Sequence, residues 1–333
     1  MLETDGGTRS VNGMRVVQVT RFGGPEVLEP REVPDAVAGP GQAVVAVSVA
    51  DVLFLDTQLR AGWGGEHFPL RPPYVPGGGV AGTVLSVGEG VDRDILGRRV
   101  VTMTEGGAYA ERAVADAAGL VGIPDGLSMP DGAALLQTGP AALGLIEAAA
   151  PEPGDWVLVT AAGGGLGVLL VQLARAAGAR VVAAARGAGK LELARELGAE
   201  VAVDYTEPDW TARVGEVTGG PRVVFDGVGG DLGAAAFGLA ARGGRVFAYG
   251  VPSGGFAEID AQEAERRQLT VTGIEQVQFE PADSARLAGQ VLRAAAQGRV
   301  TPVIGKTFPL ERAAEAHAAI ESRDVLGKTL LLA

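Results

Sequence analysis

The chain has 333 residues, of which 47% are hydrophobic and 20% are charged, a composition typical of a globular protein. Its net charge of −12 argues against binding nucleic acid or an anionic membrane through a general positive field. Cysteine is absent, which excludes disulfides and thiolate metal ligands, and the two histidines, His67 and His317, lie far apart in the sequence. We therefore expect no zinc site, and we interpret Glu66 beside His67 as part of a solvated loop.

The sequence gives no sign of a secretory or membrane-spanning segment. Residues 1–13 are polar and rich in glycine, which predicts a frayed tail. The most apolar stretch, residues 165–185, is interrupted by Gln172, Arg175 and Arg180, so it does not predict a membrane span. We expect a cytoplasmic protein.

The first 128 residues are predicted to be mostly β-structure. Short valine-rich runs are separated by turns rich in glycine and proline, as in a compact barrel. The predicted strands are Met14–Thr20, Ala43–Val49, Ala81–Val87 and Arg98–Met103. A short helix is predicted within this region at Val52–Arg60.

From Asp131 the pattern changes to alternating strands and helices. Apolar runs predict strands at Trp156–Thr160, Arg180–Ala185, Val201–Val203, Arg222–Asp226, Arg245–Gly250 and Thr270–Gly273. Helices are predicted between most of them, including Leu166–Ala177 and Gly189–Leu197. This alternation is typical of an α/β fold with a doubly wound parallel sheet, the Rossmann fold.

The last block is predicted to contain two helices, Asp283–Gln297 and Leu310–Glu321, and a final strand, Lys328–Leu332. We expect this block to return to the first domain, so that the nucleotide-binding domain is inserted in the middle of the chain. The predicted division is a catalytic domain of residues 1–128 and 275–333, and a Rossmann domain of residues 129–274.

A glycine-rich turn joins the first Rossmann strand to its helix, in the sequence WVLVTAAGGGLG. Glycine lets backbone N–H groups approach a pyrophosphate, and the helix N-terminus favours negative charge. The spacing is not a complete G-x-G-x-x-G, because Val168 occupies the last position. A second strand follows at the distance expected of a dinucleotide site, so we interpret the turn as one.

The end of the second Rossmann strand indicates which dinucleotide is bound. NAD-binding folds usually carry Asp or Glu there for the ribose 2′-hydroxyl, whereas this chain has Arg186, with Lys190 four residues later. Two cations suit a 2′-phosphate, and each charge-assisted contact contributes about 1.5–3 kcal/mol. The sequence therefore predicts NADPH, the alternative being that both cations are solvated surface residues.

These stretches resemble the medium-chain dehydrogenase/reductase superfamily, and within it the zinc-free quinone oxidoreductases of the zeta-crystallin-like branch. The resemblance covers nearly the whole chain in order. It is carried by RFGGPEVLE, DTQLRAG, PGGGVAGTVLSVGEGV, GAYAERAV, VLVTAAGGGLG, KLELARELGAEVAVDY, VVFDGVGG, GGRVFAYG, PLERAAEAHAAIESR and GKTLLL. It implies a Rossmann domain inserted into a GroES-like barrel, a site in the cleft between them, NADPH, and a homodimer paired near Thr270–Gly273.

The resemblance also implies a set of cofactor-binding positions. They comprise the pyrophosphate loop, the 2′-phosphate and adenosine region, the adenine–ribose loop, the turn near the nicotinamide and an arginine of the last helix. The pyrophosphate loop corresponds to Ala162, Gly164, Gly165 and Leu166, and the 2′-phosphate and adenosine region to Arg186, Lys190 and Tyr205. The adenine–ribose loop corresponds to Asp226, Gly227 and Val228, and the turn near the nicotinamide to Tyr249, Gly250 and Ser253. The arginine of the last helix is Arg323. For Arg323 a helix C-terminal cap is the alternative, and the two tyrosines are otherwise core residues.

The active-site side that the resemblance implies departs from the family pattern at three positions. The asparagine of the family's N-x-x-D is Leu53, the glutamate of PG-x-E-x-AG is Gly79, and the threonine of GLTA is Ala141 within GPAA. The asparagine and threonine positions border the nicotinamide or the substrate in the family. Their loss predicts a more apolar cleft and a departure from standard quinone reductase activity.

The reaction implied is hydride transfer from the nicotinamide to a quinone or an α,β-unsaturated carbonyl. Without zinc, a hydrogen-bond donor must stabilise the charge that develops on the acceptor oxygen. The substrate-cleft candidates are Leu53, Gln58, Tyr74, Gln137, Ala141 and Tyr249, and Thr138 lies beside Gln137. Surface or core packing is the alternative for each, and the sequence names no general acid.

Two further functions stay open. One is a reductase for a single biosynthetic intermediate, with a pocket rebuilt for an apolar substrate. The other is a non-catalytic NADPH-binding sensor or structural protein, which an intact cofactor site beside a depleted cleft would also fit.

Overall fold

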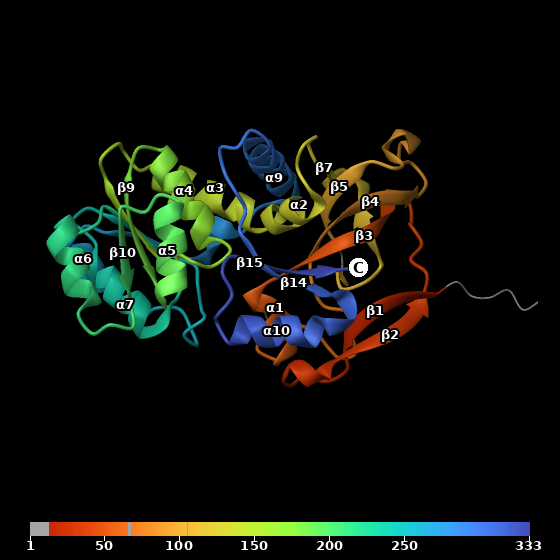
Figure 1. The fold of residues 1–333 in the computed structure, drawn as a ribbon, viewed down its shortest axis with the longest axis horizontal. Coiled ribbons are helices and arrows are strands. Elements are labelled where there is room, and N and C mark those ends of the chain that lie inside the picture. The colour runs from red at the N-terminus through yellow and green to blue at the C-terminus, as the bar shows by residue number, and fades with distance from the viewer. Residues whose placement is uncertain (1–12, 66–67, 105) are drawn as a thin grey trace, which may run out of the picture.

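The structure is a computed structural model that describes residues 13–65, 68–104 and 106–333. It has two halves, which Figure 1 shows side by side. One half is built on a parallel sheet and its helices, and the other on a barrel-like, mostly antiparallel sheet. Glu66 and His67, interpreted above as a loop, lie outside the described residues.

The barrel half combines strands from both ends of the described chain. Its seven-stranded sheet has the order β14-β15-β3-β4-β5-β7, with β6 paired to β3, and β1 and β2 form a separate pair. The strands are β1 (Gly13–Val19), β2 (Leu28–Pro34), β3 (Gln42–Val52), β4 (Gly79–Val87), β5 (Arg99–Met103), β6 (Arg112–Asp116), β7 (Val121–Gly122), β14 (Ile304–Pro309) and β15 (Lys328–Leu332). The predicted return of the last block to the barrel is therefore confirmed by β15, which pairs antiparallel with β3.

Strand β3 is the centre of this sheet. Its sequence QAVVAVSVADV is rich in β-branched residues, which pack well on a pleated surface. It pairs with β4, β6 and β15, and most of its side chains are buried. This pairing brings the end of β3 next to the start of β15.

The Rossmann half is a six-stranded parallel sheet in the order β10-β9-β8-β11-β12-β13. The strands are β8 (Trp156–Thr160), β9 (Arg180–Ala185), β10 (Val201–Asp204), β11 (Val223–Asp226), β12 (Arg245–Ala248) and β13 (Thr270–Thr272). The helices between them are α4 (Gly167–Ala176), α5 (Ala188–Glu196), α6 (Trp210–Thr218), α7 (Gly230–Leu239) and α8 (Ala261–Arg266). The strand order reverses between β8 and β11, and ligands of such sheets bind at this switch point.

Among the described residues, five further α-helices belong to the barrel or to the junction between the halves. They are α1 (Phe54–Arg60), α2 (Met129–Leu136), α3 (Thr138–Ala149), α9 (Pro281–Ala296) and α10 (Ala313–Glu321). Helix α3 packs against α4 and α9, and α2 packs on β3, β4 and β5. One hydrophobic core runs through both halves, joining Val49 and Leu330 of the barrel to Val157 of the Rossmann sheet.

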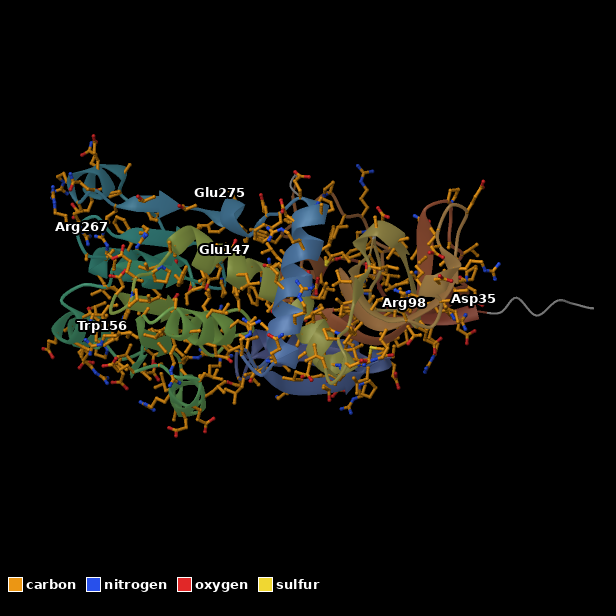
Figure 2. All side chains as sticks on the ribbon, turned by 90° about the horizontal axis from the view of Figure 1, so that it is seen from above. Asp35, Arg98, Glu147, Trp156, Arg267 and Glu275 are labelled. Carbon is orange, nitrogen blue, oxygen red and sulfur yellow. The ribbon has the colours of Figure 1, made fainter. Side chains whose placement is uncertain are left out.

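The sequence-based elements are confirmed, with bounds that differ by at most about three residues. Figure 2 shows the long axis of the molecule, with Trp156 and Arg267 at the Rossmann end and Arg98 and Asp35 at the barrel end. Within the described part of the chain, no helix is both long and apolar enough to cross a membrane.

Candidate functional site

A cleft of about 680 Å³ opens between the two halves. The barrel contributes Leu53, Phe54 and Thr329 to its lining, and the Rossmann half contributes Gly165, Tyr249 and other residues of the strand ends. We call the part near Leu53, Gln137, Ala141 and Lys328 the α1 end of the cleft, and the part near Lys190, Tyr205 and Arg323 the α5 end.

The glycine loop (residues 161–167) lies between the two ends. Ala161 holds a left-handed φ of 51°, which is uncommon outside glycine and is found preferentially at functional sites. A Cβ atom on Gly167 would lie 2.3 Å from the Ala161 carbonyl oxygen, so only glycine fits at this close approach. Gly164, Gly165 and Gly167 line the cleft where α4 begins. The loop and the helix N-terminus form a cradle that fits a pyrophosphate.

Three cations meet at the α5 end. The Arg186 guanidinium donates to the Ser322 carbonyl at 3.3 Å, the Lys190 ammonium donates to the Arg323 carbonyl, and Arg323 donates to the Pro252 carbonyl. Burial lowers the pKa of Lys190, and the charges of Arg186 and Arg323 lower it further, although Asp324 opposes them. Positive charges that repel one another in this way favour the binding of an anion.

Tyr205 completes the α5 end. Burial raises its pKa, while the nearby charges of Arg186 and Arg323 act in the opposite direction. Asp204, which the sequence analysis did not single out, accepts a hydrogen bond from the Gly187 backbone N–H at 2.8 Å and so fixes the start of α5. The strand-end positions predicted for a 2′-phosphate therefore come together in space.

The predicted cofactor positions divide into two groups. Those that line the cleft are Gly164, Gly165, Leu166, Lys190, Tyr205, Gly227, Val228, Tyr249, Gly250 and Arg323. Those that do not line it are Ala162, Arg186, Asp226 and Ser253. Asp226 is 1% exposed, and its carboxylate accepts from the Thr160 hydroxyl at 2.9 Å and from the Val228 backbone N–H at 3.0 Å, so it shapes the turn after β11.

Tyr249 lies across this turn. A Cβ atom on Gly227 would lie 3.0 Å from the Tyr249 hydroxyl oxygen, so the glycine makes room for the ring. Burial raises the pKa of Tyr249 well above its ordinary value, and the charge of Asp226 adds to this effect. The hydroxyl therefore stays protonated and is available as a hydrogen-bond donor.

The α1 end is largely apolar. Leu53 and Ala141 line it, as the sequence analysis expects of a cleft that has lost two polar side chains. Thr138 also lines it, but its hydroxyl donates to the Ala134 carbonyl at 2.8 Å within the helical segment. Gln58 and Tyr74, two further substrate-cleft candidates, do not line the cleft.

Sequence reasoning missed a buried ion pair at the α1 end. The Lys328 ammonium lies 2.6 Å from Asp51 Oδ1, with the two side chains 4% and 0% exposed. Gln137 donates through Nε2 to Asp51 Oδ2 at 3.1 Å, and both Gln137 and Lys328 line the cleft. The sequence could have indicated this pair, because Asp51 lies near the end of one apolar strand and Lys328 at the start of another. A charged side chain buried in such a strand requires a partner.

A second buried cluster lies behind the cleft. Asp56 Oδ2 accepts from the Leu53 backbone N–H at 2.8 Å and lies 3.3 Å from the Tyr109 hydroxyl, which in turn lies 2.9 Å from His317 Nε2. Burial raises the pKa of Asp56 to about 7 and lowers the pKa of His317 to about 3. In the described residues, no group of three His, Cys, Asp or Glu side chains is arranged to hold a metal ion.

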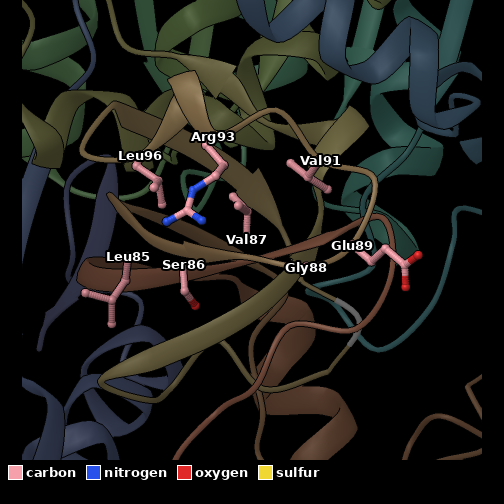
Figure 3. A pocket seen from close by; sticks show the side chains of 8 residues that line it. All are labelled: Leu85, Ser86, Val87, Gly88, Glu89, Val91, Arg93 and Leu96. Carbon is pink, nitrogen blue, oxygen red and sulfur yellow. The ribbon is translucent and has the colours of Figure 1, made fainter.

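A smaller pocket of about 380 Å³ lies at the far side of the barrel, beside the end of β4 (Figure 3). Its lining includes Leu85, Glu89, Arg93 and Leu96. It shares no residue with the cleft and contains none of the positions predicted from the sequence. We therefore treat the cleft as the candidate functional site.

Comparison with known proteins agrees with this architecture. Residues 39–125 match the alcohol dehydrogenase GroES-like domain, and residues 165–290 match the zinc-binding dehydrogenase domain. A probable quinone oxidoreductase of Schizosaccharomyces pombe is 34% identical over 95% of this chain and 96% of its own length. A 2-haloacrylate reductase of a Burkholderia species is 33% identical over 94% of this chain and 97% of its own.

Solved structures give the same result. The quinone oxidoreductase of Escherichia coli, determined in complex with NADPH, matches with a TM-score of 0.88 and 28% identity, over 96% of this chain and 100% of its own. Fold, glycine loop and sequence similarity thus agree along nearly the whole length. The chain belongs to the quinone oxidoreductase branch of the medium-chain dehydrogenase/reductase superfamily.

Proposed function

We propose that this protein is an NADPH-dependent reductase that transfers hydride, without zinc, to a quinone or an α,β-unsaturated carbonyl compound. The observation that carries the proposal is the meeting of Arg186, Lys190 and Arg323 at the α5 end. These cations repel one another until an anion binds, and the 2′-phosphate of NADPH is an anion of suitable charge. The relatives named as quinone oxidoreductases and the neighbour solved with NADPH support the same assignment.

The residues of the cleft fit this cofactor along its length. The glycine loop receives the pyrophosphate at the start of α4, and Lys190, Tyr205 and Arg323 receive the adenosine phosphate. Gly250 and Tyr249 then lie where the nicotinamide would approach the α1 end. When bound, the reduced nicotinamide supplies the hydride, while the protein supplies binding and orientation.

The α1 end determines which acceptors are suitable. Leu53, Phe54 and Ala141 present apolar surface, which excludes water and suits a flat conjugated molecule. Negative charge develops on the acceptor oxygen, and this charge requires a hydrogen-bond donor in the absence of a metal ion. Quinones and conjugated enones tolerate a weak donor because their reduced anions are already delocalised, whereas saturated ketones do not.

NADPH oxidation by the purified protein, followed by absorbance, tests this function. The acceptor panel contains an ortho-quinone, a para-quinone and a conjugated enal, with NADH as the control cofactor. We expect turnover with NADPH and at least one of these acceptors. Tight NADPH binding without turnover would instead favour a specialised biosynthetic reductase or a non-catalytic NADPH-binding protein.

The cofactor assignment has its own test. Replacing Arg186 by alanine removes one cation from the α5 end, and we expect the preference for NADPH over NADH to fall about tenfold. The ratio of kcat/KM for the two cofactors measures this preference. An unchanged ratio would mean that Arg186 is only a surface residue.

We also propose that the protein is a homodimer paired through β13. This strand is the edge of the Rossmann sheet, and its Val271 is 38% exposed. An open strand edge offers unpaired backbone groups to a second copy of the chain. Light scattering of the purified protein measures the mass in solution, and a monomer at micromolar concentration would contradict this proposal.

A further inference from the structure

Burying the ion pair of Asp51 and Lys328 costs desolvation free energy, which suggests that the pair has a role at the cleft. Both side chains are almost completely buried, and removing two charges from water costs several kcal/mol per ion, which their attraction does not always recover. Asp51 also accepts from Gln137, so one carboxylate engages two polar side chains of the α1 end, Gln137 and Lys328. A residue with only a packing role would be better replaced by an apolar one.

The path of the Lys328 side chain indicates which end of the cleft it serves. A Cβ atom on Gly165 would lie 2.5 Å from Lys328 Cδ and 3.7 Å from Cε, so the aliphatic chain crosses the glycine loop. The ammonium continues past the loop to Asp51 at the end of β3. Among the described residues that line the cleft, the other cations, Lys190 and Arg323, belong to the α5 end.

Asp51 faces a glycine across the sheet. Strands β3 and β4 pair Val49 with Ala81 and Ala50 with Val80, so the next step of this antiparallel register sets Asp51 opposite Gly79. Cross-strand neighbours project their side chains from the same face of a sheet, about 4.5–5.5 Å apart at Cβ. The family pattern PG-x-E-x-AG has a glutamate where this chain has Gly79.

The side chains of Leu136 and Gln137 pack against Gly79, and a Cβ atom on residue 79 would lie 2.8 Å from Leu136 Cδ2, the flexible end of that side chain. A Cβ atom on residue 79 would lie 3.1 Å from Gln137 Nε2, the atom that donates to Asp51. A longer side chain at residue 79 would therefore enter the same region as the Asp51 carboxylate. The chain has a carboxylate on β3 where the family pattern has one on β4.

We propose that Asp51 is a positioning residue that takes the place of the glutamate at residue 79 and holds the Lys328 ammonium and the Gln137 amide at the α1 end, where Lys328 donates to the acceptor oxygen. This inference rests on the proposed hydride transfer, because the oxygen gains negative charge only when hydride arrives. An ammonium has three N–H donors, so contact with Asp51 leaves donors for the acceptor.

Moving the carboxylate between strands tests the proposal. Asp51→Gly is expected to lower kcat about tenfold at saturating NADPH, because Lys328 loses the partner that holds it. The double variant Asp51→Gly with Gly79→Glu is expected to recover kcat to within about threefold of the wild type. The matched control pairs Asp51→Gly with Gly79→Gln, which fills the space without a charge and should not recover activity.

The variant Lys328→Met distinguishes a role of Lys328 at the acceptor from a role in cofactor binding. If Lys328 serves the acceptor, kcat falls about tenfold while the Kd for NADPH, from fluorescence titration, changes by less than about threefold. A weakened NADPH affinity with unchanged kcat would overturn the proposal. Asp51→Asn keeps the shape of the side chain but removes its charge. If this variant retained the full kcat, that result would also overturn the proposal.

Moving the carboxylate from residue 51 to residue 79 still tests the proposal if the wild-type protein reduces none of the acceptors. In that case the proposed function fails, and thermal unfolding reports on the ion pair alone. A double variant with glutamate at residue 79 that regains the Tm lost by Asp51→Gly would support the transfer of the carboxylate. A double variant no more stable than Asp51→Gly would overturn it.

Discussion

Arg323 keeps a backbone conformation that is unfavourable for a residue with a side chain. Its φ of 61° lies in the left-handed region, directly after α10, where glycine is the usual residue. The left-handed region costs roughly 1–2 kcal/mol for a residue with a Cβ atom. The side chain that this backbone supports reaches the Pro252 carbonyl, and the Arg323 carbonyl accepts from Lys190. We interpret the strain as the cost of placing a cation at the α5 end.

Replacing Arg323 by glycine should therefore separate stability from cofactor binding. Glycine adopts the left-handed φ without strain, which adds about 1 kcal/mol to the free energy of unfolding. This gain offsets the lost side-chain contact, so the free energy of unfolding should change little. The affinity for NADPH should fall about tenfold, and that for NADH should stay almost the same. Urea unfolding and fluorescence titration measure the two effects, and a parallel loss of both affinities would contradict the assignment.

Asp56 should make stability depend on pH. Burial raises its pKa from 3.8 to about 7, so between these values the folded protein keeps a proton that the unfolded chain releases. The contribution of Asp56 to the free energy of unfolding should fall as the pH rises through this window, by up to about 4 kcal/mol. In Asp56→Asn, whose amide oxygen still accepts from Leu53, that fall should be absent.

The comparison of Tm values from about pH 4 to pH 7 in both proteins checks this prediction. The buried neutral His317 acts in the opposite direction, because its pKa is lowered to about 3 and stability from it rises with pH. Its contribution is the same in both proteins and cancels in the difference. Parallel curves for wild type and variant would show that Asp56 does not carry the proton.

The glycine loop, together with the start of α4, is the element on which the proposed cofactor site depends. Gly167→Ala would bring a Cβ atom to 2.3 Å from the Ala161 carbonyl oxygen, a backbone atom that cannot move aside easily. We expect a loss of about 1–3 kcal/mol of stability and a large loss of NADPH affinity. Gly215→Ala in α6 is the matched control, because its Cβ would meet nothing within 4 Å. The control should be neutral or slightly stabilising, as measured by urea unfolding.

The elements that sequence reasoning missed have identifiable causes. Strand β2, LEPREVP, contains two prolines and three charged residues, and it forms only because it pairs along its whole length with β1. Helices α2 and α3 follow each other with Gln137 as the only residue between them, and Pro140 lies in the first turn of α3. By contrast, the Rossmann strands are continuous apolar runs, which a sequence reveals directly.

The whole molecule explains why the grouping of residues at the α5 end was more predictable than the grouping at the α1 end. Arg186, Lys190 and the glycine loop lie in consecutive elements from β8 to α5, so their spacing along the chain fixes their spacing in the fold. Asp51, Gln137 and Lys328 come from three separate segments and meet only when the barrel closes. No local sequence pattern predicts such a long-range contact. The division into domains at residues 128/129 and 274/275 stays a prediction.

Association of two molecules is predicted to depend on β13. Val271→Lys places a charge on the exposed edge of the Rossmann sheet, and charged residues at a strand edge prevent pairing between sheets. We expect the variant to be monomeric by light scattering and to keep its NADPH affinity, since β13 does not line the cleft. A variant that is still dimeric would locate the interface elsewhere.

The pairing of β15 also sets the order in which the molecule is completed during synthesis. The six strands of the Rossmann sheet all precede residue 273, so that sheet can form while the chain is still growing. Strand β15 comes last in chain order, and the Gly327 backbone N–H donates to the Gly163 carbonyl at 2.8 Å. Lys328 then reaches Asp51, which was translated long before. The proposed nucleotide cradle can therefore form on a nascent chain before the proposed acceptor site, which requires β15 to be in place.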